Sequence, residues 1–395
     1  MRGMWAADPH GLRVHGDDPR PFPRRAQVFR GLRPDCDLRP VRGMPGKQRP
    51  GRSRGSERGE NGGDGIMRKR RTRNLRLSAL AAVLILLGGL LASCGNGGKN
   101  VGYRPTVVAT NFAVYDIVRS VAGDTADVEM LLPPETESHD YEITLADAAK
   151  IARADLFVCV GGESEDWVDD TLGAMPEKDR PTVLRAVEIA STVTESDDGI
   201  LESETAAHGI HAPGEEEESE EADEHVWTSF GNIRLIARAA ADALNRIDEW
   251  GASERADNMI RYSSQLNDLE REYADLFAST DKRLIAVADR FPFRYLAEEW
   301  GLEVVAAFSG CTSNVEASLA TISALVDTVE KNSLPCVMKI ELSDGRCAEA
   351  VARETGCEVL ELQSGHNVTR AEFDAGVTLI GLMRRNLEVL RTALQ

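Results

Sequence analysis

The chain has 395 residues, of which 42% are hydrophobic and 28% are charged, and its formal net charge is −19. This length allows two domains with apolar cores. Residues 1–93 hold 20 Lys and Arg against 8 Asp and Glu, whereas the rest of the chain holds 26 against 57. The acidic part lacks the clustered basic residues that phosphate binding needs, so we expect no nucleic acid partner.

An export signal is predicted to begin at Met67. Residues 1–66 are rich in Arg, Pro and Gly and lack apolar periodicity, so we interpret them as a non-native or disordered N-terminal extension. Residues 67–93 combine a basic run with the apolar stretch Leu77–Leu91, which is short for a membrane span. This combination is typical of a bacterial signal peptide.

The signal ends in Leu91-Ala92-Ser93-Cys94, which resembles a bacterial lipobox. The resemblance implies that the Cys94 thiol is acylated after cleavage and that residues 94–104 form a lipidated tether. It places the protein at the cell membrane, lipid-anchored, on the extracytoplasmic face. An ordinary secretory signal or an N-terminal membrane anchor is the alternative interpretation.

Residues 105–250 alternate short β-rich runs with longer helical patterns, which predicts βαβ units and a mainly parallel sheet. Within them, residues 192–224 are strongly acidic and are predicted to form a solvated loop that carries His208 and His211. The expected strands are Thr106–Thr110, Val128–Leu132, Leu156–Val160 and Thr182–Val187. The expected helices are Phe112–Val121, Leu145–Ala154, Glu163–Leu172 and Asn232–Ile247.

A long connector helix is predicted for residues 251–281, because Ser253–Ser279 contains no Pro or Gly. Residues 282–395 then repeat the alternating pattern. The expected strands are Leu284–Ala288, Val304–Phe308, Val337–Leu342 and Val359–Leu362, and the expected helices are Phe293–Trp300, Val315–Lys331, Arg346–Thr355 and Arg370–Leu394. The predicted fold class is therefore α/β, with two lobes that each contain a mainly parallel sheet flanked by helices. A ligand is expected between the lobes, at the carboxyl ends of the strands.

The placement of histidine indicates a metal site. Five His lie outside residues 1–66, and three of them, His139, His225 and His366, lie in loop contexts beside predicted strands or helices. Imidazole suits zinc, and carboxylates can complete the ligand shell. No CxxC pair is present, so a thiolate site is not expected.

From about Pro105 onward, the chain resembles the metal-binding subunits of bacterial zinc and manganese ABC importers, a family that includes lipoproteins once called adhesins. Ser138–Glu142 (SHDYE) resembles the motif that holds the family's first ligand, and Glu224–Trp227 (EHVW) resembles the motif of the second. The resemblance implies His139 and His225 as ligands. It also implies delivery of the metal to permease and ATPase subunits by a monomeric binding protein.

The second half departs from the family's commoner pattern. The segment Asp289–Tyr295 (DRFPFRY) lacks the family's usual His, so Asp289 is the expected substitute ligand. The fourth ligand is expected after the last strand, where the chain holds Glu361, Gln363 and His366, and we favour His366. Glu341, after the preceding strand, is the alternative carboxylate.

The predicted site is therefore an N3O set formed by His139, His225, Asp289 and His366. This set is compatible with tetrahedral Zn²⁺ as the cargo, whereas Mn²⁺ prefers more oxygen ligands. The acidic loop, with His208 and His211, is predicted to be either a weak secondary zinc site or a solubilising segment. The acidic, His-bearing loop is typical of the zinc-specific members of the family.

Three other functions are alternatives to zinc capture. A manganese-binding subunit of the same kind of importer is the first, and a surface adhesin without a transport role is the second. An enzyme is the third, and it is not expected because the chain has no HExxH, GxSxG or P-loop pattern. An adhesin has no need for converging histidines, so the His residues favour metal capture.

Overall fold

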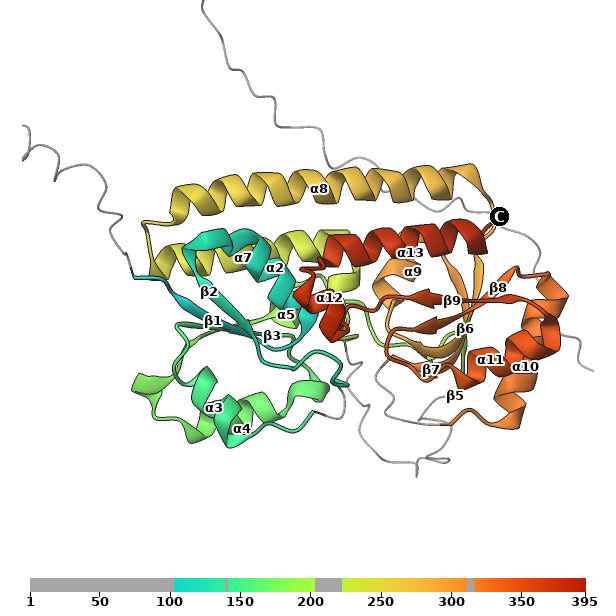
Figure 1. The fold of residues 1–395 in the computed structure, drawn as a ribbon, viewed down its shortest axis with the longest axis horizontal. Coiled ribbons are helices and arrows are strands. Elements are labelled where there is room, and N and C mark those ends of the chain that lie inside the picture. Colours follow the sequence, from blue (N-terminus) through green and yellow to red (C-terminus); the bar gives the residue numbers. More distant parts are fainter. Residues whose placement is uncertain (1–102, 139–140, 203–221, 311–315) are drawn as a thin grey trace, which may run out of the picture. The chain divides into compact units, whose positions relative to one another are not determined.

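The computed structural model describes residues 103–138, 141–202, 222–310 and 316–395. Within these residues the chain forms two sheets, with strand orders β2-β1-β3-β4 and β5-β7-β6-β8-β9. All the pairings between these strands are parallel. Figure 1 shows helices on both faces of each sheet. The predicted α/β class with two mainly parallel sheets is confirmed.

The first sheet lies between two helical layers because its buried strands are apolar on both faces. Val107 packs in the cluster that includes α2 and α7, whereas its neighbour Val108 packs with α3 and α4. The strands are β1 (Thr106–Ala109), β2 (Asp127–Met130), β3 (Leu156–Cys159) and β4 (Thr182–Arg185). The helices are α2 (Phe112–Ala122), α3 (Leu145–Ile151), α4 (Trp167–Ala174), α5 (Ala186–Ile189) and α7 (Phe230–Ile247).

The second sheet is built in the same way. Ile285 and Val287 pack in the cluster that includes α9 and α13, and Ala286 packs with α10 and α11. The strands are β5 (Ile200–Glu202), β6 (Leu284–Phe291), β7 (Glu303–Ser309), β8 (Cys336–Ile340) and β9 (Glu358–Leu362). The helices are α9 (Arg294–Trp300), α10 (Leu319–Asn332), α11 (Arg346–Thr355), α12 (Arg370–Asp374) and α13 (Leu379–Ala393).

The predicted connector is one helix, α8 (Ala252–Ser279), which packs against α2 and α7 and also against α13 (Figure 1). Its buried apolar side chains recur on one face, including Leu266, Leu269 and Tyr273. The Tyr273 hydroxyl donates a 2.7 Å hydrogen bond to the carbonyl of Met383 on α13. One apolar cluster therefore runs from the first sheet, along α8, to the second. In the part of the chain that the structure describes, no helix is long and apolar enough to cross a membrane.

The acidic segment differs from the single solvated loop that we expected over residues 192–224. Its Ile200–Glu202 portion is strand β5, which pairs in parallel with β7 of the second sheet. Gly199 makes this possible because its φ is +82° and its carbonyl accepts a 2.8 Å hydrogen bond from Ala306 N. Three residues are too few for a periodic signal, and the pairing partner lies far along the chain. Residues 203–221, which include His208 and His211, lie outside the described residues.

Two other expectations need correction in the second sheet. Strand β6 continues to Phe291, so Asp289 lies inside the strand and not after it. The register shifts between Val287 and Arg290, as it does at a β-bulge, which changes the direction of the side chains there. The single helix expected over 370–394 is two helices, because Gly376 adopts φ +73° and Thr378 caps α13.

Candidate metal-binding site

The structure describes four of the residues predicted to serve as ligands or as the alternative carboxylate. These are His225, Asp289, Glu341 and His366. The predicted ligand His139 lies outside the described residues, as do Cys94 and the loop histidines His208 and His211.

His225 lies in the turn that leads into α7 and is buried, with 1% of its surface exposed. Asp223 Oδ1 accepts hydrogen bonds from His225 N (2.8 Å) and from His225 Nδ1 (3.0 Å). An ionised carboxylate can only accept, so Nδ1 carries the proton and the lone pair of the neutral ring lies on Nε2. Burial alone would lower the pKa of His225, but the charge and the hydrogen bond of Asp223, together with the charges of Glu224 and Glu195, outweigh burial and raise the pKa.

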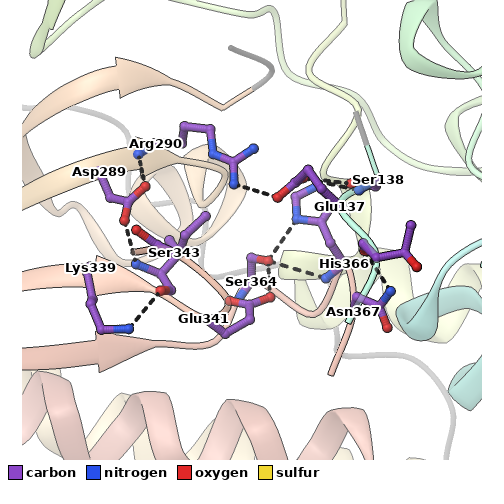
Figure 2. Close-up of polar contacts among 12 residues, drawn as sticks. Glu137, Ser138, Asp289, Arg290, Lys339, Glu341, Ser343, Ser364, His366 and Asn367 are labelled. Carbon is purple, nitrogen blue, oxygen red and sulfur yellow. Dashed lines mark hydrogen bonds and ion pairs between the residues drawn. The ribbon is translucent and has the colours of Figure 1, made fainter. Parts of the chain in front are cut away.

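His366 follows β9, at the carboxyl edge of the second sheet (Figure 2). Its Nδ1 lies 2.7 Å from the Ser364 hydroxyl, and that hydroxyl donates to the buried carboxylate of Glu341. Because the Ser364 proton is directed to Glu341, the hydroxyl accepts from His366 Nδ1. Nε2 therefore carries the lone pair of His366, as it does in His225.

The structure brings these two imidazoles together. The ring centroids of His225 and His366 are 4.8 Å apart, and Trp227 lies against both, at 5.5 Å and 5.1 Å. The indole Nε1 of Trp227 donates a 2.8 Å hydrogen bond to Ser364 O, and Phe112 N donates to His366 O at 3.0 Å. The loop after β9 is therefore fixed against elements of the first sheet.

Gly310, directly after β7, lies against the ring of His225. A Cβ atom at this position would lie 2.7 Å from Cε1 of His225. Real Cβ atoms do not approach this closely, so the second sheet contacts the His225 ring through bare backbone. The close approach shows that both sheets contribute to the surroundings of His225.

Asp289 lies apart from His366 in Figure 2. Its Oδ1 accepts from Arg290 N at 2.9 Å and its Oδ2 accepts from Ile340 N at 3.3 Å. It lines a separate cavity of about 200 Å³ together with Phe308 and Asp344. Among the described residues, no three His, Cys, Asp or Glu side chains converge in an arrangement that could hold a metal ion. The described residues thus bring the two histidines together without a third His, Cys, Asp or Glu that could complete a metal site with them.

The segment that leads to His139 is attached to the loop of His366. Asn367 Nδ2 donates 2.8 Å hydrogen bonds to the carbonyls of Pro133 and Thr136. Arg290 forms a 2.8 Å ion pair with Glu137, whose carboxylate points toward the guanidinium in Figure 2. These contacts hold the chain up to Ser138, one residue before His139, close to His366.

The structure places beside the site two acidic residues that the sequence did not indicate as part of it. Glu165 and Glu224 line a narrow cavity of about 30 Å³ with Tyr141 and His366. Burial raises the pKa of Glu165 to about 7, and the charge of Glu224 adds to this rise. The available signal was the position of Glu165 just past β3, at the carboxyl edge of the first sheet. With this pKa, Glu165 carries part of a negative charge near neutral pH, and that charge together with Glu224 favours a cation near His366.

Known proteins match most of the described chain. The family described as zinc-uptake complex component A, periplasmic (ZnuA) matches residues 107–393. The zinc-binding lipoprotein AdcA of Streptococcus pneumoniae is 29% identical over 316 residues, which are 80% of this chain and 60% of that protein. The high-affinity zinc uptake system protein ZnuA of Bacillus subtilis is 26% identical over 310 residues, 77% of this chain and 94% of that protein.

A solved structure has a similar fold. The crystal structure of the Zn(II)-bound ZnuA-like domain of Streptococcus pneumoniae AdcA superposes with a TM-score of 0.60 and 26% sequence identity. The match covers 74% of this chain and 99% of that domain. The chain thus spans about three-fifths of the whole AdcA lipoprotein but nearly all of its ZnuA-like domain.

Proposed function

The chain belongs to the periplasmic zinc-uptake complex component A family, and on that premise we propose that it captures zinc outside the cytoplasm and delivers it to an ABC importer. One observation carries the proposal for this chain. The imidazole of the buried His225 and that of the half-buried His366, one beside each sheet, lie 4.8 Å apart, and the Nδ1 atom of each has a hydrogen-bond partner, so that the lone pair of each ring lies on Nε2. Neutral imidazole with Nδ1 bonded to an acceptor is the usual arrangement of a histidine that ligates zinc.

The proposed ligand core is His139, His225 and His366. His139 would come from the first lobe, at the end of a segment that Asn367 attaches to the His366 loop and that the Glu137–Arg290 ion pair attaches to β6. A fourth ligand could be a carboxylate or water, since zinc accepts either. Asp289 remains the carboxylate predicted from the sequence. Asp289 accepts from Arg290 N and Ile340 N at a place apart from His366, so it would have to move to reach an ion that His366 binds.

A site with ligands from both lobes would make the conformation of the protein depend on the cargo. Permease and ATPase subunits that respond to that conformation are the proposed partners, and the binding protein acts as a monomer. We further propose that cleavage before Cys94 and acylation of its thiol anchor the protein at the extracytoplasmic face of the cell membrane. A Cys94→Ala variant should then move from the membrane fraction to the soluble fraction.

The choice of cargo can be tested on purified, metal-stripped protein. We expect one tightly bound Zn²⁺ per chain in a competition titration with a chromophoric chelator, and much weaker Mn²⁺ binding, because three imidazoles and at most one carboxylate suit zinc. Equal affinity for Mn²⁺ would instead favour the manganese importer subunit. The absence of any tight metal would favour the adhesin alternative.

The His225→Ala and His366→Ala variants complete the test. Each should weaken Zn²⁺ binding by more than tenfold, which corresponds to about 1.4 kcal/mol or more. Glu361→Gln is a suitable control, because Glu361 is exposed on β9 and pairs with Lys339. Unchanged zinc affinity in both histidine variants would show that the paired imidazoles are not the site.

A further inference from the structure

We infer that Glu341 and Ser364 do not bind the cargo ion but position His366, by fixing which imidazole nitrogen faces the site. This inference rests on the proposed function, since it assigns a role around a proposed ligand. It also gives Glu341 a different role from the one the sequence allowed, in which its carboxylate was an alternative ligand.

The first support is the set of donors that already surrounds Glu341 (Figure 2). The carboxylate is buried, with 7% of the residue exposed. Oε2 accepts from Ser364 N at 2.6 Å, and Oε1 accepts from Gly365 N at 3.1 Å and from the Ser364 hydroxyl. A carboxylate offers about four acceptor positions, and three of them hold the loop after β9. Glu341 therefore has about one acceptor position left, and coordination of an ion through any other position would displace a buried donor, which is unfavourable.

The second support is the direction of the hydrogen bonds that link Glu341 to Ser364 and Ser364 to His366. Ser364 has one hydroxyl proton, which it donates to Glu341, so it can only accept from His366 Nδ1. His366 N also points to the same hydroxyl, at 3.3 Å. The Ser364 side chain thus fixes both the backbone and the ring of His366, and Glu341 fixes the Ser364 side chain.

The third support is the similarity to His225. Asp223 accepts directly from His225 Nδ1, whereas Glu341 acts on His366 through one hydroxyl. With Glu341 ionised, both imidazoles therefore carry the proton on Nδ1 and the lone pair on Nε2. Without the Glu341 charge, the Ser364 proton could turn toward His366 and favour the other tautomer, which would place the lone pair on the wrong nitrogen.

The test compares Glu341→Gln, Ser364→Ala and the double variant with the wild type. We expect each single variant to weaken Zn²⁺ binding by about tenfold, the lower end of the range typical of residues that orient metal ligands. The double variant should bind no more weakly than the weaker single variant, since the two residues act in series. If Glu341→Gln folds poorly, Ser364→Ala alone tests the inference. The unfolding midpoint of each metal-free variant shows whether it is folded.

The visible absorption spectrum of the Co²⁺-loaded protein separates orientation from coordination. If Glu341 positions His366, the Co²⁺ bands of Glu341→Gln should keep the shape and intensity of the wild type at saturation. A changed coordination spectrum, together with losses of affinity that multiply in the double variant, would show that Glu341 is a ligand and would overturn the inference. Unchanged Zn²⁺ affinity with a lowered unfolding midpoint would reduce Glu341 to a structural role and would also overturn it.

The control is again Glu361→Gln, because Glu361 lies on β9 and pairs with Lys339, outside the hydrogen bonds that link Glu341, Ser364 and His366. Failure of the proposed function looks different, because the wild-type protein would then bind no Zn²⁺ tightly. Failure of the inference alone leaves wild-type binding intact and sensitive to His366→Ala while both single variants bind as the wild type does.

Discussion

Asp223→Asn should weaken zinc binding by about tenfold. Asp223 is buried, and its Oδ1 accepts from both the backbone nitrogen and Nδ1 of His225. Asparagine keeps the size and one acceptor oxygen but removes the charge. Hydrogen bonds to charged groups contribute about 1.5–3 kcal/mol, against about 0.5–1.5 kcal/mol for neutral ones. The loss of about 1–1.5 kcal/mol at the ring corresponds to roughly tenfold in Kd.

The physical reason is that zinc draws electrons from the imidazole and makes Nδ1–H a stronger donor, so the carboxylate stabilises the metal-bound ring more than an amide does. The pH dependence follows with a definite sign. Asp223 raises the pKa of His225, so protons compete with zinc for the wild-type ring at a higher pH than for the variant ring. The difference in affinity between the two proteins should therefore narrow as the pH falls from about 8 to about 6.

A chelator-competition titration at several pH values measures both effects. Asp170→Asn is the matched control, because it makes the same change on the exposed surface of α4. If Asp223→Asn binds zinc as tightly as the wild type near pH 8, the carboxylate does not support a metal-bound His225, and the assignment of that ligand is undermined.

Three further predictions concern the segment around β5. Gly199→Ala should lower the free energy of unfolding by about 2 kcal/mol or more in urea, because φ is +82° and the added Cβ would lie 2.1 Å from Val304 O; an unchanged midpoint would contradict this. Glu202→Gln should cost about 1 kcal/mol near neutral pH. Burial acts to raise the pKa of Glu202, but hydrogen bonds, the largest from Thr321, outweigh it and lower the pKa. The stabilisation by ionised Glu202 is present above the pKa of this residue in the unfolded chain, and it is lost as the pH falls through the lower pKa of the folded protein. The unfolding midpoints of the wild type and of Glu202→Gln should therefore converge in acid and differ near neutral pH. Deletion of residues 203–221 should leave the tight zinc site intact and remove only weaker zinc binding; loss of the tight site would place a loop histidine in it.

Much of the fold could be predicted because the strands and helices carry their own periodic patterns. The buried strand Leu156–Cys159 and the helix Phe230–Ile247 have patterns that local burial explains. Strand β5 could not be predicted, since it has three residues in an acidic segment and depends on pairing with a strand about a hundred residues away. Long-range pairing is set by tertiary structure, and a single sequence contains no direct signal of it.

In the site, too, some features could be predicted from local sequence, whereas others depend on tertiary structure. Its two described histidines could be predicted to converge, because His225 precedes a helix and His366 follows a strand at the edges where such sheets bind ligands. The direction of the Asp289 side chain could not be predicted, since it depends on an irregular register between Val287 and Arg290. The role of Asp223 could not be predicted, because it depends on the turn that folds the Asp223 carboxylate back against His225.

X-ray absorption at the zinc edge of the protein loaded with one equivalent of Zn²⁺ tests the central claim most directly. It reports the number and the type of atoms bound to the ion, and imidazole rings are distinguished by scattering from their outer atoms. We predict a shell with three imidazole nitrogens at about 2.0–2.1 Å, with any remaining ligand an oxygen. A shell that contains sulfur at about 2.3 Å, or one with fewer than two imidazoles, would contradict the assignment of the paired histidines as the zinc site.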